Sequence, residues 1–190
     1  PLELAAALRG ASETADLMQE QEEVEMVWTG PFSGLVPSRH TEQVLLEVIQ
    51  SAKSKLFIMS FVAYDIESIF KSLQNAIDRN VGIDILLESS KSHGGKIDID
   101  SIDAFRKNLP SANIYTWSTE SKASGKWTGV VHAKCTVADG NLAFITSANL
   151  TMAAMERNME LGVLVRGGNL PSRLARHLEA LIHTGVIERL

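Results

Sequence analysis

The sequence contains a single cysteine, Cys135, among 190 residues, and it contains no long apolar run. One cysteine excludes a disulfide within the chain and a zinc site built from several thiolates. A membrane-spanning helix requires about 18 consecutive apolar residues, a length that no segment reaches. The basic start and short apolar core of a secretion signal are also missing. We therefore expect a cytoplasmic protein that does not enter the membrane.

Motifs that bind metal ions are missing as well. The sequence has no HExxH pattern, no paired acidic motif and no cluster of cysteine and histidine residues at ligand spacing. We therefore expect no metal ion and no other cofactor, so that any catalytic charge comes from side chains.

The acidic charge is concentrated at one end of the chain. The formal net charge is −5, but residues 1–25 hold seven acidic side chains and only Arg9 as a basic one. The rest of the chain carries 17 basic and 16 acidic residues, so it is almost neutral. This predicts an acidic helical N-terminal arm over 1–25 and a folded domain over 26–190. The arm could dock a partner or imitate DNA, and the simpler interpretation is a solvated helix.

Apolar strands alternate with amphipathic helices over most of the domain. With 45% hydrophobic residues, the chain can bury a single core without disulfides. Continuous apolar strands are typical of parallel sheets whose two faces are both covered. We therefore predict an α/β fold with a mixed, mainly parallel sheet flanked by helices on both faces. The expected strands are 25–30, 55–62, 81–88, 112–118, 130–138, 142–146 and 159–165, and the expected helices are 41–54, 65–80, 98–109 and 170–183.

Polar side chains interrupt the apolar strands in the last third of the sequence. His132 and Lys134 are two positions apart, so in a strand both leave the same face of the sheet. Ser147 and Asn149 follow the next strand, and Glu160 opens a third. Because the three strands follow one another directly, we expect these five side chains to converge at neighbouring strand ends.

This set of groups suits phosphoryl transfer. A neutral imidazole can attack phosphorus and form a covalent intermediate, and a carboxylate on its other ring nitrogen fixes the tautomer. An ammonium and a carboxamide can donate to the non-bridging oxygens as charge builds on them. The alternative is a partly buried histidine, an edge-strand lysine and ordinary turn residues without a catalytic role.

The spacing resembles the signature of the phospholipase D superfamily. The pattern is H-x-K-x4-D followed by S-x-N and a later glutamate, formed here by His132, Lys134, Asp139, Ser147, Asn149 and Glu160. The stretch from residue 26 to 165 is also similar to the phospholipase D-like proteins of bacterial DISARM anti-phage defence loci. The resemblance implies a phospholipase D-like fold and phosphodiester chemistry.

The resemblance also implies a role for each member of the signature. His132 would be the nucleophile that forms a phosphohistidine, and Glu160 would orient it. Lys134 and Asn149 would bind the phosphate, and Ser147 would donate a further hydrogen bond. Asp139 would complete the catalytic set. Since Asp139 lies beside the Gly140 turn, structural hydrogen bonding is its more natural role.

The signature occurs once, whereas the resemblance implies that two copies form a site. The residues two positions after the other histidines (His40, His93, His177 and His183) are glutamate or glycine, never lysine. A chain with one motif completes the site by pairing with a second copy across a two-fold axis. We therefore predict a homodimer in which His132 of both chains lies in one site.

Two loops combine basic residues with an aromatic one near the predicted site. Lys122, Lys126 and Trp127 precede the His132 strand, and Lys91 and His93 follow the strand 81–88. Basic and aromatic groups together suit a nucleic acid backbone and its bases. The favoured function is a metal-independent nuclease that acts on single-stranded or duplex DNA in anti-phage defence, with other defence proteins as partners. The alternatives are a phospholipid phosphodiesterase and a non-catalytic nucleic-acid-binding defence subunit.

Overall fold

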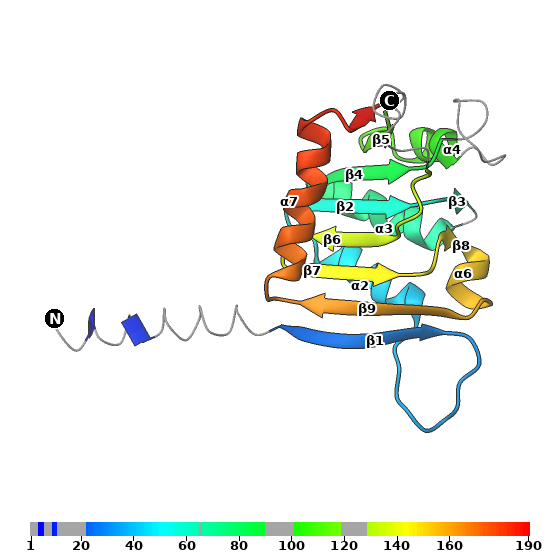
Figure 1. Ribbon diagram of the computed structural model, residues 1–190, viewed down its shortest axis with the longest axis vertical. Coiled ribbons are helices and arrows are strands. Elements are labelled where there is room, and N and C mark those ends of the chain that lie inside the picture. The colour runs from blue at the N-terminus through cyan, green and yellow to red at the C-terminus, as the bar shows by residue number, and fades with distance from the viewer. Residues whose placement is uncertain (1–3, 6–8, 11–21, 65, 90–100, 119–128) are drawn as a thin grey trace.

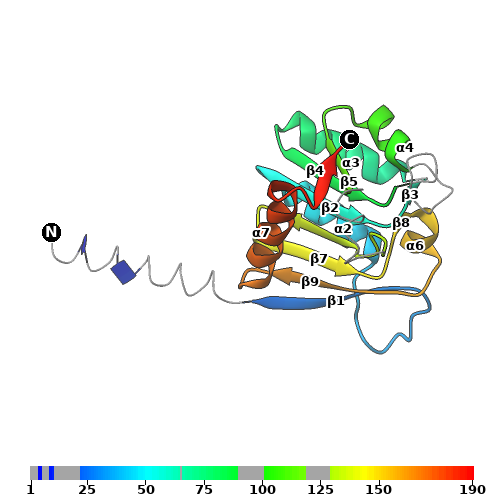
Figure 2. The same cartoon turned by 45° about the horizontal axis from the view of Figure 1, so that its top comes forward.

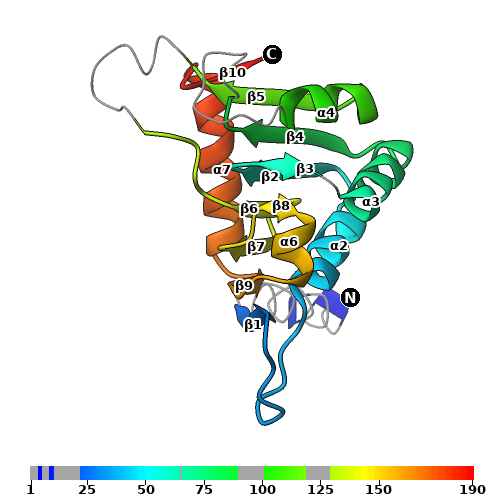
Figure 3. The same cartoon turned by 90° about the vertical axis from the view of Figure 1, so that its right-hand side faces the viewer.

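The computed structural model describes residues 4–5, 9–10, 22–64, 66–89, 101–118 and 129–190. Its centre is an eight-stranded sheet in the order β1-β9-β7-β6-β2-β4-β5-β10, beside a two-stranded sheet of β3 and β8 (Figure 1). Helix α7 lies on one face of the large sheet, and helices α2, α3 and α4 cover the other (Figure 3). The prediction of an α/β fold with helices on both faces of a mixed sheet is confirmed.

The strands are β1 (Glu23–Thr29), β2 (Lys55–Ser60), β3 (Ala63–Tyr64), β4 (Gly82–Leu87), β5 (Asn113–Trp117), β6 (Cys135–Ala138), β7 (Leu142–Thr146), β8 (Leu150–Thr151), β9 (Glu160–Arg166) and β10 (Ile187–Arg189). The helices are α2 (Thr41–Ser51), α3 (Glu67–Asp78), α4 (Ser101–Asn108), α6 (Met152–Glu156) and α7 (Leu170–His183). Among the described residues, no helix is long and apolar enough to cross a membrane.

Parallel pairing is limited to the β2–β4–β5 part of the large sheet. The other described pairings in that sheet are antiparallel, which corrects the prediction of a mainly parallel sheet. The reason lies in the connections, because a parallel pair requires a crossover such as the one through α3 between β2 and β4. After β5 the chain instead forms the β6–β7 hairpin, and β1 and β9 add antiparallel strands at the edge.

The two faces of the sheet are covered to different extents. On one face, α2 and its neighbours bury a large cluster that includes Val44, Val48 and Ile58. On the other face, Leu178 of α7 packs on a smaller cluster with Phe57 and many partly buried members. A single helix therefore covers most of that second face.

The two strands at one edge of the sheet, β1 and β9, carry an apolar surface that α7 leaves exposed. Met26 of β1 pairs with Val163 of β9, which in turn pairs with Ile145 of the cluster beneath α7, so these side chains share the α7 face. We call the residues of this face on β1 and β9 the β1–β9 strip: Val24, Met26, Trp28, Leu161 and Val163. Val24 is 58%, Met26 46% and Leu161 52% exposed. Figures 1 and 2 show β1 as the outermost strand, next to β9.

The strand β1 begins at Glu23, inside the predicted N-terminal arm. Residues 23–25 pair with β9 and are part of the sheet. Most of the remaining arm, residues 1–3, 6–8 and 11–21, lies outside the described residues, so its predicted helix stays a prediction.

Candidate active site

The candidate nucleophile lies before a strand rather than inside one. Strand β6 begins at Cys135, whereas the sequence predicted a strand from residue 130, so that prediction was too long. Residues 129–134 run as irregular chain at the end of the sheet where β2 and β7 finish, the end that faces the viewer in Figure 3. The segment is joined to β7 by a hydrogen bond from Thr146 N–H to the Lys134 carbonyl (3.1 Å).

His132 and Lys134 lie against each other at this end of the sheet. Nζ of Lys134 is 3.1 Å from Nδ1 and 3.3 Å from Nε2 of the His132 ring, and it donates to the His132 carbonyl at 2.7 Å. The His132 ring is exposed on one side and contacts Phe61, with ring centroids 5.2 Å apart. The lysine thus holds the imidazole and places a cation at its ring.

Lys134 is buried although its ammonium group is charged. The residue is 8% exposed, and its Nζ lies 5.9 Å from the centre of the Phe61 ring. Burial lowers the pKa of Lys134 below its usual value of 10.5, and the nearby Glu160 carboxylate partly opposes this. A buried cation that lacks a full counter-charge favours a bound anion, such as a phosphate group.

Ser147 and Glu160 meet beside this pair. The Ser147 hydroxyl donates to Glu160 and accepts the Leu161 N–H at 3.1 Å. The other carboxylate oxygen of Glu160 accepts Nδ2 of Asn158 at 3.2 Å. Among the described residues, these hydrogen bonds occupy the Glu160 carboxylate, and the predicted contact with the His132 ring is not formed within one chain. The orienting role of Glu160 stays a prediction for the assembled site.

Asn149 follows β7 and precedes β8. The residue is half-buried, and its Oδ1 atom is buried without a hydrogen-bond partner among the described residues. Because buried amide groups are normally paired, this oxygen has capacity left to accept a hydrogen bond. A hollow of about 450 Å³ at the same end of the sheet is lined by His132, Ala133, Lys134, Cys135, Ile145, Thr146, Ser147 and Leu174. The structure therefore brings His132, Lys134 and Ser147 to one hollow, whose lining includes neither Asn149 nor Glu160.

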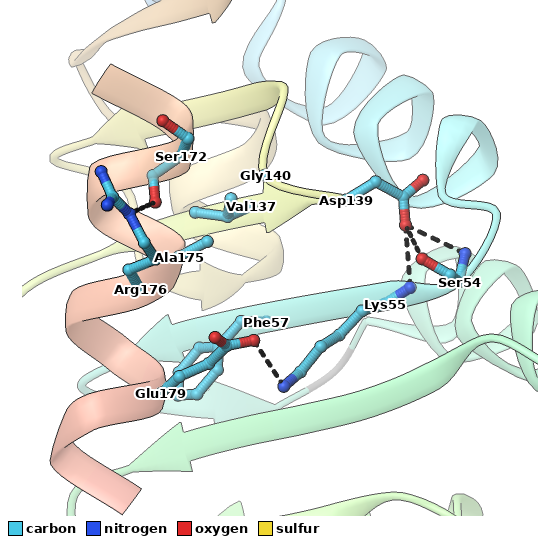
Figure 4. A pocket seen from close by; sticks show the side chains of 10 residues that line it. All are labelled: Ser54, Lys55, Phe57, Val137, Asp139, Gly140, Ser172, Ala175, Arg176 and Glu179. Carbon is cyan, nitrogen blue, oxygen red and sulfur yellow. Dashed lines mark hydrogen bonds and ion pairs between the residues drawn. The ribbon is translucent and has the colours of Figure 1, made fainter. Parts of the chain in front are cut away.

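The last member of the signature, Asp139, lies at the opposite end of β6 (Figure 4). Its carboxylate accepts the backbone N–H groups of Lys53, Ser54 and Lys55 at 2.8 to 2.9 Å, and also the Ser54 hydroxyl. Burial alone would raise the pKa of Asp139, but these hydrogen bonds together lower it below its usual value of 3.8. The structure does not bring Asp139 to His132; it ties the β6–β7 turn to the start of β2.

We expect Asp139→Ala to destabilise the fold while leaving catalysis intact. The change removes a charged acceptor of four hydrogen bonds and strains a backbone position with φ of 52°, so it should cost about 2 to 3 kcal/mol of unfolding free energy. In the wild type this contribution is present above the pKa of unfolded aspartate and is lost as the pH falls through the lowered folded pKa. Urea unfolding and activity at low temperature measure the two effects, and a large loss of activity in folded Asp139→Ala would contradict this placement.

Several site features could not be read from the sequence. Phe61 and Glu88 directly follow the distant strands β2 and β4 and belong to no motif, and Asn158 precedes the signature glutamate without a pattern of its own. The five predicted substrate contacts, Lys91, His93, Lys122, Lys126 and Trp127, lie outside the described residues. Within the described part of the chain, no group of three or more His, Cys, Asp or Glu side chains could hold a metal ion.

The chain belongs to the phospholipase D-like family, because the family described as "Cardiolipin synthase, PLD-like domain" matches residues 45–182. Members of this superfamily are phosphodiesterase hydrolases. The DISARM protein DrmC of Bacillus paralicheniformis is 28% identical over 151 residues, which cover 78% of this chain and 59% of DrmC. The chain thus spans less than two thirds of that relative.

Solved structures share the fold at lower identity. Nuc of Salmonella typhimurium, a phospholipase D family member, has a TM-score of 0.65 and 22% identity over 90% of this chain and 99% of Nuc. Phosphatidylserine synthase of Haemophilus influenzae has a TM-score of 0.62 and 13% identity over 90% of this chain and 40% of the synthase. These two likenesses show the common fold.

Proposed function

We propose that this protein is a nuclease that cleaves DNA without a metal ion, through a phosphohistidine on His132, in bacterial anti-phage defence. The observation that carries the proposal is the exposed imidazole of His132 with the buried ammonium of Lys134 at its ring. The similarity to DrmC supports the defence role. The match to nearly the whole of Nuc supports a small phosphodiesterase.

The proposed reaction has two displacements at phosphorus. First, a ring nitrogen of His132 attacks the phosphodiester, a P–N bond forms, and the bond to one ester oxygen breaks. Lys134 and Asn149 donate to the non-bridging oxygens as negative charge grows there, and the Ser147 hydroxyl joins them by turning its proton from Glu160 to the phosphate. The departing oxygen takes a proton from an acid. Water then attacks the phosphohistidine, the P–N bond breaks, and the acid regains its proton from that water.

The substrate class is tested by offering the wild-type protein several phosphodiesters in the presence of EDTA. The panel holds single-stranded DNA, duplex DNA, RNA and phosphatidylcholine vesicles. We expect cleavage of DNA that persists in EDTA. Turnover of lipid alone would replace the proposal by a phospholipid phosphodiesterase. Binding of DNA without turnover of any substrate would favour a non-catalytic defence subunit.

The acid of this reaction is proposed to be His132 of a second copy, which makes the protein a homodimer. The β1–β9 strip offers a surface for that copy, since it is apolar, exposed and continuous with Ile145 of the catalytic hollow. The opposite face of the same two strands is already covered, because Val27 and Leu164 are fully buried in the cluster beneath α2. The exposed apolar surface of this sheet edge therefore lies on the α7 face.

We expect Met26→Asp to separate the dimer and lower the activity. A carboxylate on this strip would be buried unpaired in the interface, which costs several kcal/mol of association free energy. Light scattering after gel filtration measures the mass, and Leu190→Asp, which alters an exposed leucine on the far edge of the sheet, is the matched control. A wild-type protein that stays monomeric at micromolar concentration and is still active would argue against the shared site.

A further inference from the structure

A buried carboxylate lies next to the candidate nucleophile without belonging to the signature. Glu88 directly follows β4, is 1% exposed, and accepts the backbone N–H of Val131 at 2.6 Å. Val131 immediately precedes His132. Burying a carboxylate is costly unless its hydrogen bonds compensate. A buried carboxylate at this position therefore indicates a structural or functional role.

The backbone around His132 is not held by the sheet. Regular pairing of β6 with β2 and β7 begins at Cys135. On the C-terminal side of His132, two hydrogen bonds of Lys134 hold the chain. The Lys134 carbonyl accepts the Thr146 N–H, and the Lys134 ammonium donates to the His132 carbonyl. On the N-terminal side, the described backbone contact is the short, charge-assisted hydrogen bond to Glu88. The nucleophile thus lies between two anchors from different strands.

We propose that Glu88 is a positioning residue, whose carboxylate fixes the chain at Val131 and so sets the direction of the His132 imidazole. The inference rests on the proposed role of His132 as the nucleophile. In-line attack at phosphorus tolerates little misplacement, and a shift of about 1 Å in a reacting group can cost about 100-fold in rate. What the site needs from Glu88 is an oxygen acceptor at a fixed place, rather than a proton or a contact with the substrate.

The test compares two substitutions of Glu88 with two of Asp84. Glu88→Gln keeps an acceptor oxygen of the same reach, whereas Glu88→Leu removes it. Asp84 is the matched control, since it is a buried carboxylate of β4, 6% exposed, whose contacts include Asn113 at 2.7 Å and Lys55 at 3.6 Å. Asp84→Asn and Asp84→Leu report the effect of removing a buried carboxylate from the same strand away from His132. Each variant is measured for kcat, KM, thermal unfolding and amide hydrogen exchange at Val131.

We expect Glu88→Leu to lower kcat by about 100-fold with little change in KM, and to speed the exchange of the Val131 amide. Glu88→Gln should restore slow exchange and most of kcat, and Asp84→Leu should lower the unfolding temperature without lowering kcat of the folded protein. The inference is overturned if Glu88→Leu keeps wild-type kcat, if Glu88→Gln is as inactive as Glu88→Leu, or if the Val131 exchange is unchanged. A wild type that cleaves no phosphodiester would refute the proposed function instead, and the exchange at Val131 would still show whether Glu88 holds the chain.

Discussion

Replacing His132 by alanine is expected to abolish phosphodiester cleavage, with kcat reduced by about 10⁴-fold or more. The reason is that the imidazole is the exposed nucleophile of the hollow, whereas burial raises the pKa of the Cys135 thiol to about 12 and keeps it protonated. Lys134 is held as a cation donor, and the Ser147 hydroxyl is bonded to Glu160. The ring of His132 is exposed, so its removal should leave the stability of the fold almost unchanged.

The matched control for this substitution is His177→Ala. His177 is an exposed histidine on α7, and its loss should leave kcat unchanged. Rapid quenching with labelled substrate should also trap a phosphorylated wild-type protein whose label is labile to acid and stable to alkali. His132→Ala that retains substantial cleavage, or a label that maps to another residue, would refute the assigned nucleophile.

Replacing Lys134 by alanine is expected to lower kcat/KM by about 10² to 10³-fold, because a buried donor aimed at the developing charge is lost. The substitution also removes the hydrogen bond to the His132 carbonyl, so part of the loss comes from a less ordered imidazole. Lys55→Ala is the matched control, since Lys55 pairs with Glu179 (Figure 4) and lies at the other end of β2. Equal losses in both variants would show that Lys134 has no special role.

The alkaline side of the pH profile gives a second measure of the same residue. Because burial lowers the pKa of Lys134, the cation is lost at a lower pH than in an ordinary lysine with a pKa of 10.5. The value of kcat/KM should therefore fall as the pH rises through that lowered pKa. Lys134→Arg keeps its charge beyond this range and should abolish the fall, although its different shape lowers the rate. A fall that persists in Lys134→Arg would assign it to another group.

Elements with strong local signals were predicted well from the sequence. Helix α7 has the predicted bounds, 170–183, because its periodicity is clear and Pro171 stands in its first turn. The turn at Asp139 and Gly140 was also predicted, and both residues have the positive φ that such a hairpin turn requires. In both cases the nearby residues are sufficient to predict the local structure.

Features that depend on distant residues were predicted less well. The expected strand from residue 130 is shorter in the structure, because Val131 is buried in the cluster beneath α7 without being part of a strand. The expectation of a mainly parallel sheet was also wrong, since strand pairing depends on the whole path of the chain. Glu88 could not be connected to His132 from the sequence, because 43 positions separate it from Val131.

The spacing between Lys134 and Asp139 in the motif corresponds to the length of a strand. Strand β6 contains four residues, Cys135–Ala138, and they alone separate Lys134 from Asp139. The four residues between Lys134 and Asp139 in the motif are therefore the length of strand β6. One end of this strand is fixed where Asp139 accepts the backbone N–H groups of residues 53–55. One added residue would either turn Lys134 to the α7 face or carry Asp139 past those amides. The aspartate would thus fix the position of β6 from the opposite end of the strand, without taking part in the chemistry.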